Sequence, residues 1–413
     1  MLRWLVSLRA FAILNIAFFI YLFYDGKFWK YYIFINTTII IAYVVYNYGR
    51  IIVNKLNPKS YSEMENKGYT VVIPCFNEES ELLKECVRSV MEQKNIFKKE
   101  IIIVDDGSTN NIWKTIQELG KKYPEILTLR SKENKGKRNA HLIAINKSRQ
   151  EFIVSIDSDT ILKDDAIKNL LKPFSNNNIG ATTGNVLIKN ESKNWLTRIQ
   201  AGLYWVGLNI YKDSQSTMGN VLCCSGCLSA YRKSDILDIM DEYLNQSFQG
   251  NKCNASEDRY LTNLINEKGK DVVYVKDAVC LTEAPTTMKK FIKQQWRWKK
   301  GYMRETLYTT TYAWKKSKAL FLENVIFMMF LPILQFAMTA LTIYILFANP
   351  MYFFVVLFPL LLLFIIARDI LFFAQHPIKG LLYLPYIFLY MFVLYPMNVA
   401  TVFHSNPERW GTR

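Results

Sequence analysis

The apolar residues of this chain gather in long tracts near its two ends, and this distribution restricts its fold more than any other feature. Residues 5–23 and 31–46 form two tracts before a polar middle, and residues 320–348, 351–367 and 380–403 form three more after it. A helix needs about 20 apolar residues to cross a bilayer core of about 30 Å. No small-residue cleavage site follows the first tract, so we do not expect a cleaved signal peptide. The sequence therefore predicts membrane helices on both sides of a polar domain.

The basic residues beside these tracts predict an orientation, because Lys and Arg near membrane spans favour the cytoplasmic side. Most of them fall on one side if the amino terminus and the middle domain are cytoplasmic: Arg3, Arg9, Arg50, Lys55, Lys59, Lys315, Lys316, Lys318, Arg368 and Lys379. Lys27 and Lys30 go against this pattern. We expect a multi-pass protein of the plasma membrane with a cytoplasmic middle domain. Pro385 and Pro396 leave two interpretations of the last tract open, a clean crossing or a broken, re-entrant segment.

The net charge of +16 indicates an anionic partner, either lipid or a phosphate-bearing substrate. We do not expect nucleic acid as a partner, since no nucleic-acid-binding motif is present. The seven cysteines all lie in the middle domain, and an odd number in a cytosolic domain indicates free thiols. Cys224 and Cys227 form a C-x-x-C pair, but no second pair and only three histidines accompany it, so we do not expect a structural zinc site.

The middle domain alternates strand and helix patterns. Residues 69–73, 101–104 and 152–156 are short β-branched or apolar runs, and residues 79–93 between the first two have helical spacing. This alternation predicts a mostly parallel sheet, whose ligands gather beyond the carboxyl ends of the strands. Each predicted strand ends in a polar or acidic cluster, so we expect a binding site at that edge.

Two of these clusters are acidic. Asp105 to Ser108 fits either a site or a simple turn with a helix cap. Asp157 and Asp159 lie two residues apart at a strand end, where both carboxylates can face one pocket. Their repulsion favours a divalent cation, and Mg²⁺ or Mn²⁺ takes few carboxylates and fills its other positions with water and phosphate oxygens.

A basic loop, Lys135 to Asn139, lies between the second and third predicted strands. It fits a solvated charged loop. It also fits a glycine-relaxed cationic loop that faces a diphosphate opposite the carboxylates.

These segments carry a family resemblance. The chain resembles the processive family 2 membrane glycosyltransferases, and within them most of all the bacterial hyaluronan synthases, with chitin-type and capsular polysaccharide synthases as near relatives. Eight segments carry the likeness, in the order of the family: VVIPCFNEES, IIIVDDGST, KGKRNA, SIDSDT, CSGCLSAYRK, SEDRYLTN, QQWRW and WGTR. The resemblance runs from about residue 70 to the last residue. It implies an α/β fold of the GT-A type, a mostly parallel nucleotide-sugar-binding sheet inserted between transmembrane helices with amphipathic interface helices.

The resemblance also implies roles for individual residues. Asp258 is similar to the catalytic base of the family, and Asp157 and Asp159 resemble its motif for Mg²⁺ or Mn²⁺ on the UDP diphosphate. The other donor-side residues are Pro74, Asn77, Glu78 and Asp106 at the uridine, with Lys137, Arg138, Gln294 and Arg297 near the diphosphate. Acceptor-side residues are Ser225, Gly226 and Trp298, and the gating tail is Trp410, Gly411, Thr412 and Arg413.

The expected chemistry agrees with these roles. An acceptor hydroxyl is a poor nucleophile at neutral pH, so a carboxylate that takes its proton helps by about 10²- to 10⁴-fold. The leaving UDP gathers negative charge, which a metal and fixed cations stabilise. Without the resemblance, a charged surface cluster of Asp258 with Glu257 and Arg259 would be the better interpretation than a catalytic base.

The chain departs from the hyaluronan synthase pattern in two places. Ser256 and Glu257 stand where those enzymes carry a small residue and a second Asp, and Glu257 is closer to the chitin-type version. Trp296 occupies a position that is more often Asn or Leu. We interpret Cys223 and Cys227, which flank Ser225 and Gly226, as small packing residues near the acceptor.

The segment from Lys289 to Tyr302 fits both a membrane anchor and a part of the active site. Phe291, Trp298 and Met303 fit an interfacial helix with lysines at the headgroups. Gln294, Arg297 and Trp298 share about one helical turn and can reach the diphosphate and a sugar ring. Trp296 points elsewhere at helical spacing, so we assign it to the membrane or to packing.

Together these features predict five segments: two transmembrane helices (1–55), a cytoplasmic GT-A domain (56–285), an amphipathic interface segment with the Q-x-x-R-W motif (286–318), transmembrane or re-entrant helices (319–404) and a cytoplasmic tail (405–413). The predicted function is a processive inverting polysaccharide synthase that extrudes its product, with hyaluronan from UDP-GlcNAc and UDP-GlcA as first choice. A single-sugar polymer such as chitin is the alternative. A non-processive lipid glycosyltransferase and a transport protein with a nucleotide-sensing domain agree less well with the motifs. The expected partners are the UDP-sugars, the growing polysaccharide and membrane lipid.

Overall fold

The computed structural model describes residues 1–25, 29–62, 67–94 and 98–404. The chain divides into two compact units. The α/β unit comprises residues 54–190 and 207–284, and the helical unit comprises residues 1–53, 191–206 and the described chain from residue 285 onward.

The core of the α/β unit is an eight-stranded sheet in the order β3-β2-β1-β4-β7-β6-β10-β5. Its strands are β1 (Tyr69–Cys75), β2 (Lys99–Asp105), β3 (Ile126–Arg130), β4 (Phe152–Ser155), β5 (Ile161–Leu162), β6 (Ile179–Ile188), β7 (Ser229–Arg232) and β10 (Asp271–Thr282). Strands β1 to β4 pair in parallel, as do β6 and β10, whereas β7 pairs antiparallel with both β4 and β6. A separate hairpin joins β8 (Ser247–Phe248) to β9 (Asn251–Lys252). The predicted mostly parallel sheet is confirmed.

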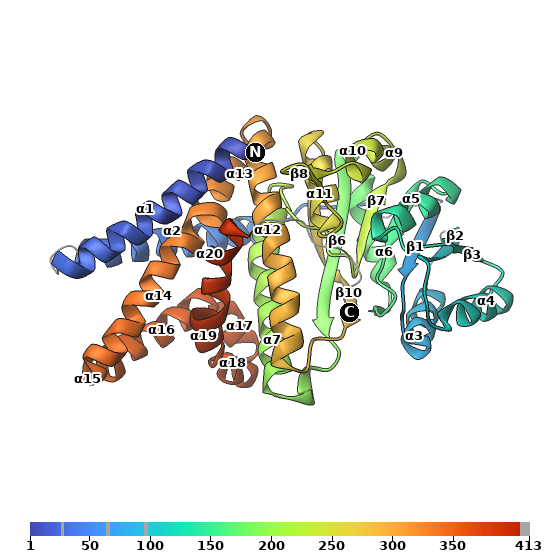
Figure 1. Cartoon of the computed structure of the whole chain (residues 1–413). Coiled ribbons are helices and arrows are strands. Elements are labelled where there is room, and N and C mark those ends of the chain that lie inside the picture. Colours follow the sequence, from blue (N-terminus) through green and yellow to red (C-terminus); the bar gives the residue numbers. More distant parts are fainter. Residues whose placement is uncertain (26–28, 63–66, 95–97, 405–413) are drawn as a thin grey trace. The chain divides into compact units, whose positions relative to one another are not determined.

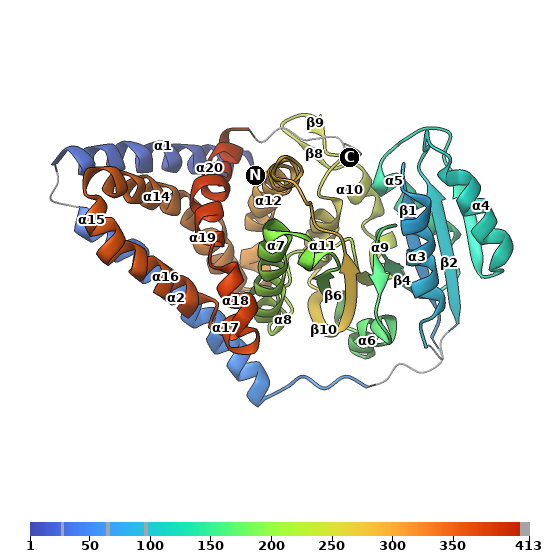
Figure 2. The same cartoon turned by 90° about the horizontal axis from the view of Figure 1, so that it is seen from below.

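The three predicted strands and the predicted helix 79–93 are all present. All seven residues of β1 are buried, as in parallel strands that are covered on both faces. The helices of this unit are α3 (Ser80–Met91), α4 (Ile112–Lys122), α5 (Lys137–Lys147), α6 (Ala166–Leu171), η1 (Lys172–Ser175), η3 (Gly207–Lys212), α8 (Asp213–Ser216), α9 (Lys233–Leu237), α10 (Met240–Leu244) and α11 (Glu257–Glu267). Helix α5 packs against β1 and β2, and α4 packs against β3 (Figures 1 and 2).

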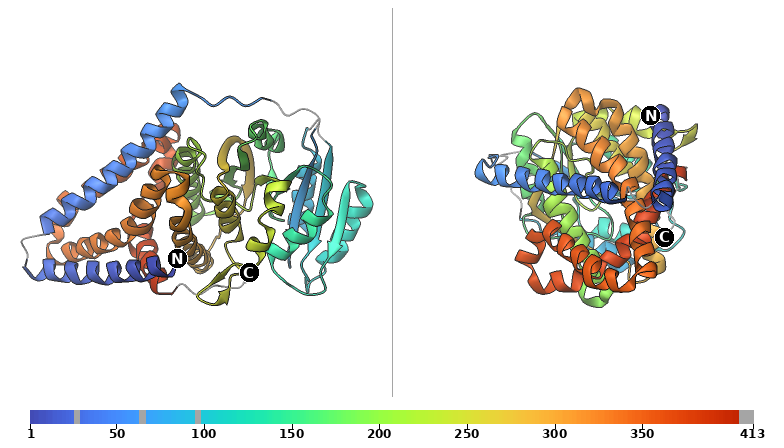
Figure 3. Two further views of the ribbon diagram at one scale, coloured as in Figure 1. Left: turned by 90° about the horizontal axis from the view of Figure 1, so that it is seen from above. Right: turned by 90° about the vertical axis from the view of Figure 1, so that its left-hand side faces the viewer.

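The helical unit begins with α1 (Leu2–Asp25) and α2 (Trp29–Leu56), which contain the two predicted amino-terminal spans. Helix α7 (Trp195–Val206) and the long helix α12 (Met288–Lys316) follow. The rest comprises α13 (Lys318–Leu322), η4 (Glu323–Phe330), α14 (Leu331–Ala348), α15 (Pro350–Tyr352), η5 (Phe353–Leu357), α16 (Phe358–Arg368), α17 (Ile370–Gln375), α18 (Pro377–Tyr383), α19 (Tyr386–Leu389), η6 (Tyr390–Leu394) and α20 (Tyr395–Phe403). Helix α14 runs beside α1 and also contacts α20, which packs against α12 (Figures 2 and 3).

Three helices of the described chain are long and apolar enough to cross a membrane: Lys318–Ala348, Pro350–Arg368 and Tyr386–Phe403. They coincide with the three carboxyl-terminal apolar tracts. The last tract is interrupted at Pro385, because α18 ends at Tyr383 and the span-length helix starts at Tyr386. Pro396 does not interrupt this helix, since the π-helical turn η6 directly precedes it, and local π adjustments allow a helix to accommodate a missing N–H.

Candidate active site

The loops that follow β1 and β2 are bonded to each other at the carboxyl edge of the sheet. Asn77 has a left-handed backbone with a φ of 51°, and its N–H donates to Ser108 Oγ at 2.9 Å. The Asn77 side-chain oxygen accepts from the Thr109 N–H at 2.8 Å. Asp105 Oδ1 accepts from the Ser108 N–H at 3.0 Å, so Asp105 also holds this turn. The loops therefore form one continuous rim.

Glu78 links this rim to the loop after β4. The Ser158 hydroxyl donates to Glu78 Oε2 at 2.7 Å, and both side chains are buried. Ser158 lies between Asp157 and Asp159. The two predicted uridine residues Asn77 and Glu78 thus lie on the same edge as the predicted metal motif, and Pro74 pairs with Val104 of β2 just beneath them.

Asp106 anchors the predicted cationic loop. Its carboxylate is fully buried and accepts from the backbone N–H groups of Lys135 at 3.1 Å and Gly136 at 2.8 Å. Burial raises the pKa of Asp106, and these two hydrogen bonds partly offset the increase. Gly136 has a φ of 91°, a conformation that favours glycine, and α5 starts at the next residue.

Lys137 is buried, with 6% of its side chain exposed, so the solvated-loop interpretation is wrong for this residue. Its Nζ lies 2.7 Å from Asp157 Oδ1 and 3.4 Å from Glu257 Oε1. Burial alone would lower the pKa of Lys137, but the two carboxylates outweigh it and hold the pKa well above its usual value. Lys137 therefore stays charged and joins the strand-end aspartate to helix α11.

Arg138 is also buried, and its described contacts are with protein groups. It donates to the Tyr243 carbonyl at 2.7 Å and to Gln246 Oε1. Its guanidinium lies 5.2 Å from the Tyr243 ring and 5.3 Å from the Tyr260 ring. These contacts brace α5 against α10 and α11, and the predicted donor contact of Arg138 stays a prediction.

Glu257 and Asp258 open helix α11 after Ser256, whose φ is 62°. Only 7% of Glu257 is exposed, so the surface-cluster interpretation of this segment is wrong. Burial alone would raise the pKa of Glu257, but Lys137 and other cations outweigh it and lower the pKa below its usual range. Burial and the Glu257 charge raise the pKa of Asp258. The two neighbouring carboxylates are thus tuned in opposite directions, a pattern typical of acid–base sites.

The segment from Cys223 to Cys227 lies between the two groups of carboxylates. Cys227 Sγ is 3.6 Å from Asp157 Oδ2, and Cys223 Sγ is 3.8 Å from Asp258 Oδ2. All seven cysteines are free, as predicted. Burial raises the pKa of both thiols, so they stay neutral and pack against the carboxylates without adding charge.

Gly226 keeps space open above this cluster. A Cβ at this position would lie 2.6 Å from Lys137 Nζ and 3.3 Å from Asp157 Oδ2. The family-matched Ser225 is adjacent, and its hydroxyl accepts from Lys212 Nζ at 2.9 Å. The motif analysis missed Lys212, because no recognised motif contains it and only the fold brings it to Ser225.

The residues of the predicted metal motif fit a divalent cation for which water and substrate supply most of the ligands. The described chain has no group of three His, Cys, Asp or Glu side chains that could hold a metal. Asp157 and Asp159 supply two carboxylates, and the absence of a Cβ at Gly226 leaves room beside Asp157. Mg²⁺ and Mn²⁺ suit such a site, since they commonly bind through one or two carboxylates plus phosphate oxygens and water.

The Q-x-x-R-W motif belongs to helix α12 of the helical unit. Trp298 is 40% exposed, and its ring lies 6.2 Å from that of Tyr204. Trp296 packs elsewhere, with His404 at 6.3 Å and the Lys300 ammonium at 5.3 Å from its ring, as predicted. Gln294 Oε1 is a buried acceptor with no hydrogen-bond partner in the described chain.

The predicted lipid-facing position of Phe291 and Met303 on α12 is wrong. Phe291 and Met303 are buried, with exposed fractions of 0% and 2%, so they pack inside the protein and do not form a lipid-facing surface. The predicted gating residues, Trp410 to Arg413, lie outside the described residues.

Comparisons with known proteins agree with this geometry. Residues 70–239 match the model of glycosyl transferase family 2. A hyaluronan synthase of Streptococcus pyogenes serotype M3 is 33% identical over 369 residues, which cover 87% of this chain and 85% of that protein. The chain belongs to glycosyl transferase family 2. Another Streptococcus pyogenes hyaluronan synthase is 34% identical to this family 2 chain over 352 residues, or 82% of that relative.

Other relatives match a shorter part of this family 2 protein. An N-acetylglucosaminyltransferase of Bradyrhizobium diazoefficiens is 34% identical over 237 residues, or 57% of this chain. The chain spans about half the length of that relative, 49%. A mannosyltransferase of Pyrobaculum calidifontis, solved with GDP-Man and Mn²⁺, has a TM-score of 0.58 at 15% identity and covers 90% of this chain and 98% of its own. That likeness establishes the glycosyltransferase fold.

Proposed function

We propose that this protein is a processive, inverting polysaccharide synthase that makes hyaluronan from UDP-GlcNAc and UDP-GlcA. The observation that carries the proposal is the extent of the match to the streptococcal hyaluronan synthases, which covers 87% of this chain and therefore reaches beyond the α/β unit into the helices. The N-acetylglucosaminyltransferase relatives match only 57% of it. We infer that the helical unit serves to pass the growing polysaccharide across the plasma membrane, with the α/β unit cytoplasmic.

Asp258 is the proposed catalytic base. The acceptor hydroxyl attacks the anomeric carbon of the donor sugar, the bond from that carbon to the UDP oxygen breaks, and the hydroxyl proton passes to the Asp258 carboxylate. A pKa raised by burial suits this task, because a base works best when its pKa approaches the working pH. A single displacement of this kind converts an α-linked donor into a β-linked product.

Asp157 and Asp159 would hold Mg²⁺ or Mn²⁺, which when bound supplies positive charge to the leaving diphosphate. Lys137 orients the Asp157 carboxylate through its 2.7 Å contact and adds a fixed cation beside it. Pro74, Asn77, Glu78 and Asp106 form the proposed uridine edge. Arg138 supports the site through α5.

Residues of the turn from Cys223 to Cys227 and of helix α12 complete the proposed site. Ser225 and Gly226 border the acceptor, next to Lys212. Gln294, Arg297 and Trp298 are proposed to meet the diphosphate and the acceptor sugar, since a tryptophan face suits a sugar ring.

A polymer of one sugar, such as chitin or poly-GlcNAc, is the second candidate. One observation favours it: Glu257 replaces the second Asp of the hyaluronan enzymes and pairs with Lys137 at 3.4 Å. A non-processive lipid glycosyltransferase agrees less well, because such enzymes commonly lack the Q-x-x-R-W motif.

The decisive experiment supplies purified protein in lipid, with Mg²⁺ or Mn²⁺, with UDP-GlcNAc alone, UDP-GlcA alone, or both. We expect UDP release and high-mass product only with both donors. Polymer from UDP-GlcNAc alone would overturn the hyaluronan assignment in favour of the second candidate. No polymer from any combination would overturn both.

A further inference from the structure

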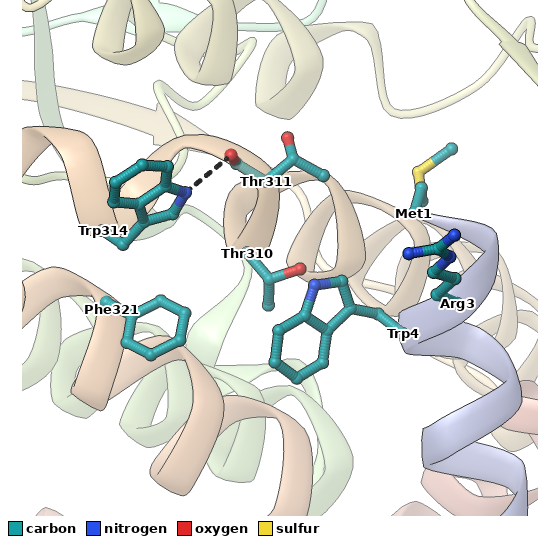
Figure 4. A pocket seen from close by; sticks show the side chains of 7 residues that line it. All are labelled: Met1, Arg3, Trp4, Thr310, Thr311, Trp314 and Phe321. Atoms are coloured by element: carbon teal, nitrogen blue, oxygen red, sulfur yellow. Dashed lines mark hydrogen bonds between the residues drawn. The ribbon is translucent and has the colours of Figure 1, made fainter.

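The helical unit contains a cavity of about 560 Å³ that lies outside the candidate active site. Three helix ends line it: Met1, Arg3 and Trp4 at the start of α1, Thr310, Thr311 and Trp314 near the end of α12, and Phe321 of α13 (Figure 4). Its volume is within the range of about 300–1,000 Å³ that is usual for small-molecule sites. Neither the predicted motifs nor the proposed reaction uses these residues.

The position of the cavity along the chain places it beside the ends of membrane helices. Phe321 lies in the first turns of the candidate span Lys318–Ala348. Arg3 and Trp4 immediately precede the apolar tract that begins at residue 5. Trp4 and Trp314 are of the residue type that gathers at membrane–water interfaces, because an indole is apolar with one polar edge.

The wall of the cavity is aromatic. The rings of Trp4 and Phe321 meet edge to face with centroids 6.4 Å apart. Figure 4 shows Trp314 beside Phe321, with the Trp314 Nε1 donating to the Thr311 carbonyl at 3.3 Å. The Thr310 hydroxyl donates to the Leu307 carbonyl at 2.6 Å, so it is not a free donor for a ligand. The wall thus suits hydrocarbon.

The two chain segments that line the cavity carry only basic charged side chains. Residues 1–8 and 310–322 contain no Asp or Glu but include Arg3, Lys315, Lys316 and Lys318. Among the described residues, no ion pair involves the Arg3 guanidinium. Arg3 is the one charged side chain of the described lining, and its planar fork of N–H donors matches a phosphate.

We propose that this cavity binds the headgroup of an anionic phospholipid, with the lipid phosphate on Arg3 and the upper acyl chain against Trp4 and Phe321. A free phosphate or nucleotide would use the cation and leave the aromatic wall exposed to water, whereas a phospholipid satisfies both. A bound lipid ties the start of α1 to the junction of α12 and α13. The proposal does not depend on which polymer the enzyme makes.

The test uses the quenching of tryptophan fluorescence by lipids with brominated acyl chains. The full chain in phosphatidylcholine nanodiscs is titrated with brominated phosphatidylglycerol or brominated phosphatidylcholine. The quenching that belongs to this site is the part present in the wild-type protein and absent from the Trp4→Phe variant. We expect half of this quenching to be reached at a lower mole fraction of brominated phosphatidylglycerol than of brominated phosphatidylcholine among the nanodisc lipids. Arg3→Gln should weaken the phosphatidylglycerol response about tenfold and Arg3→Lys much less, because a charge-assisted contact to phosphate is strong.

Lys290→Gln is the matched control, since it removes one exposed charge from the opposite end of the same helix α12. It should leave the response unchanged. Equal quenching by both lipids, an Arg3→Gln response equal to wild type, or displacement by soluble glycerol phosphate would each overturn the proposal. The last result would indicate a free-anion site.

Discussion

At the scale of single residues, the surroundings of two adjacent carboxylates shift their pKa values in opposite directions. Glu257 and Asp258 are consecutive in the chain, yet of these two carboxylates only Glu257 forms an ion pair with Lys137, at 3.4 Å. The lysine keeps Glu257 ionised, and the resulting negative charge, together with burial, raises the pKa of Asp258. Sequence alone does not reveal this division, because Lys137 lies far from both residues in the chain.

The Asp258→Asn variant tests the proposed base. The amide keeps the shape of the side chain but cannot take the hydroxyl proton, so we expect UDP release to fall by at least about 10²-fold. Binding of UDP, measured by calorimetry, should be unchanged. Substantial turnover in this variant would exclude Asp258 as the base.

The Glu257→Gln variant tests the coupling of the two carboxylates. Asp258 must be ionised to act, so kcat/KM falls as the pH drops through its pKa, which burial and Glu257 raise. Removing the Glu257 charge should move this acidic limb to lower pH. The measurement is the pH profile of UDP release, with the exposed Glu242→Gln variant as control. An unchanged limb, or one moved to higher pH, would contradict the coupling.

At the scale of elements, short turns and helix faces decide which side chains can reach the site. The turn from Cys223 to Cys227 reaches both groups of carboxylates because Gly226 has no side chain. Helix α12 separates its two central tryptophans, with Trp298 near Tyr204 and Trp296 near His404.

Gly226→Ala tests the turn. The added methyl would lie 2.6 Å from Lys137 Nζ, and this flexible side-chain end would have to move away from Asp157. We expect turnover to fall about tenfold or more while the thermal unfolding midpoint changes little, since the backbone need not move. Gly207→Ala is the control, because a Cβ there meets no heavy atom within 4 Å. Equal activity of the two variants would show that this space is not needed.

The tryptophans of α12 provide a second test at this scale. Trp298→Ala should abolish elongation, measured as high-mass product, because the proposed sugar-stacking face is lost. Trp296→Phe should be tolerated, since a phenyl ring keeps the packing against His404. Comparable loss in both variants would remove the distinction between them.

At the scale of the whole molecule, burial of titratable groups couples stability to pH. His141 is buried beneath the site, 3.1 Å from Ser155 Oγ and 3.3 Å from the Tyr243 hydroxyl. Burial and the neighbouring Lys137 lower the pKa of His141 to about 4. The unfolded chain, with a histidine pKa of about 6.5, therefore binds more protons than the folded protein between these values, and stability falls as the pH drops from about 6.5 to 4.

His141→Gln should weaken this pH dependence. From pH 7 to pH 5 the wild-type protein should lose about 2 kcal/mol of unfolding free energy through His141. The variant should lose less over the same interval, whatever its stability at pH 7. Unfolding in detergent at the two pH values measures the difference, with the exposed His404→Gln as control. Identical pH dependence in His141→Gln and wild type would contradict the assignment.

The sequence by itself determined the features that depend on local patterns. Apolar tracts of span length lie where the helices of the helical unit are found, and β-branched runs became β1, β2 and β4 within two residues of their predicted bounds. The order of the motifs was sufficient to identify the family. These features follow from the composition and periodicity of contiguous residues, and the sequence alone shows both.

Only the tertiary structure decided which side chains meet. It buried Lys137 and Arg138, which the sequence placed on a cationic loop, and it buried Phe291 and Met303, which the sequence placed toward lipid. It also brought Lys212 to Ser225 and assembled the basic aromatic cavity of the helical unit. The physical reason is that a side chain's burial and charge environment are set by partners up to hundreds of residues away, and no local pattern encodes them.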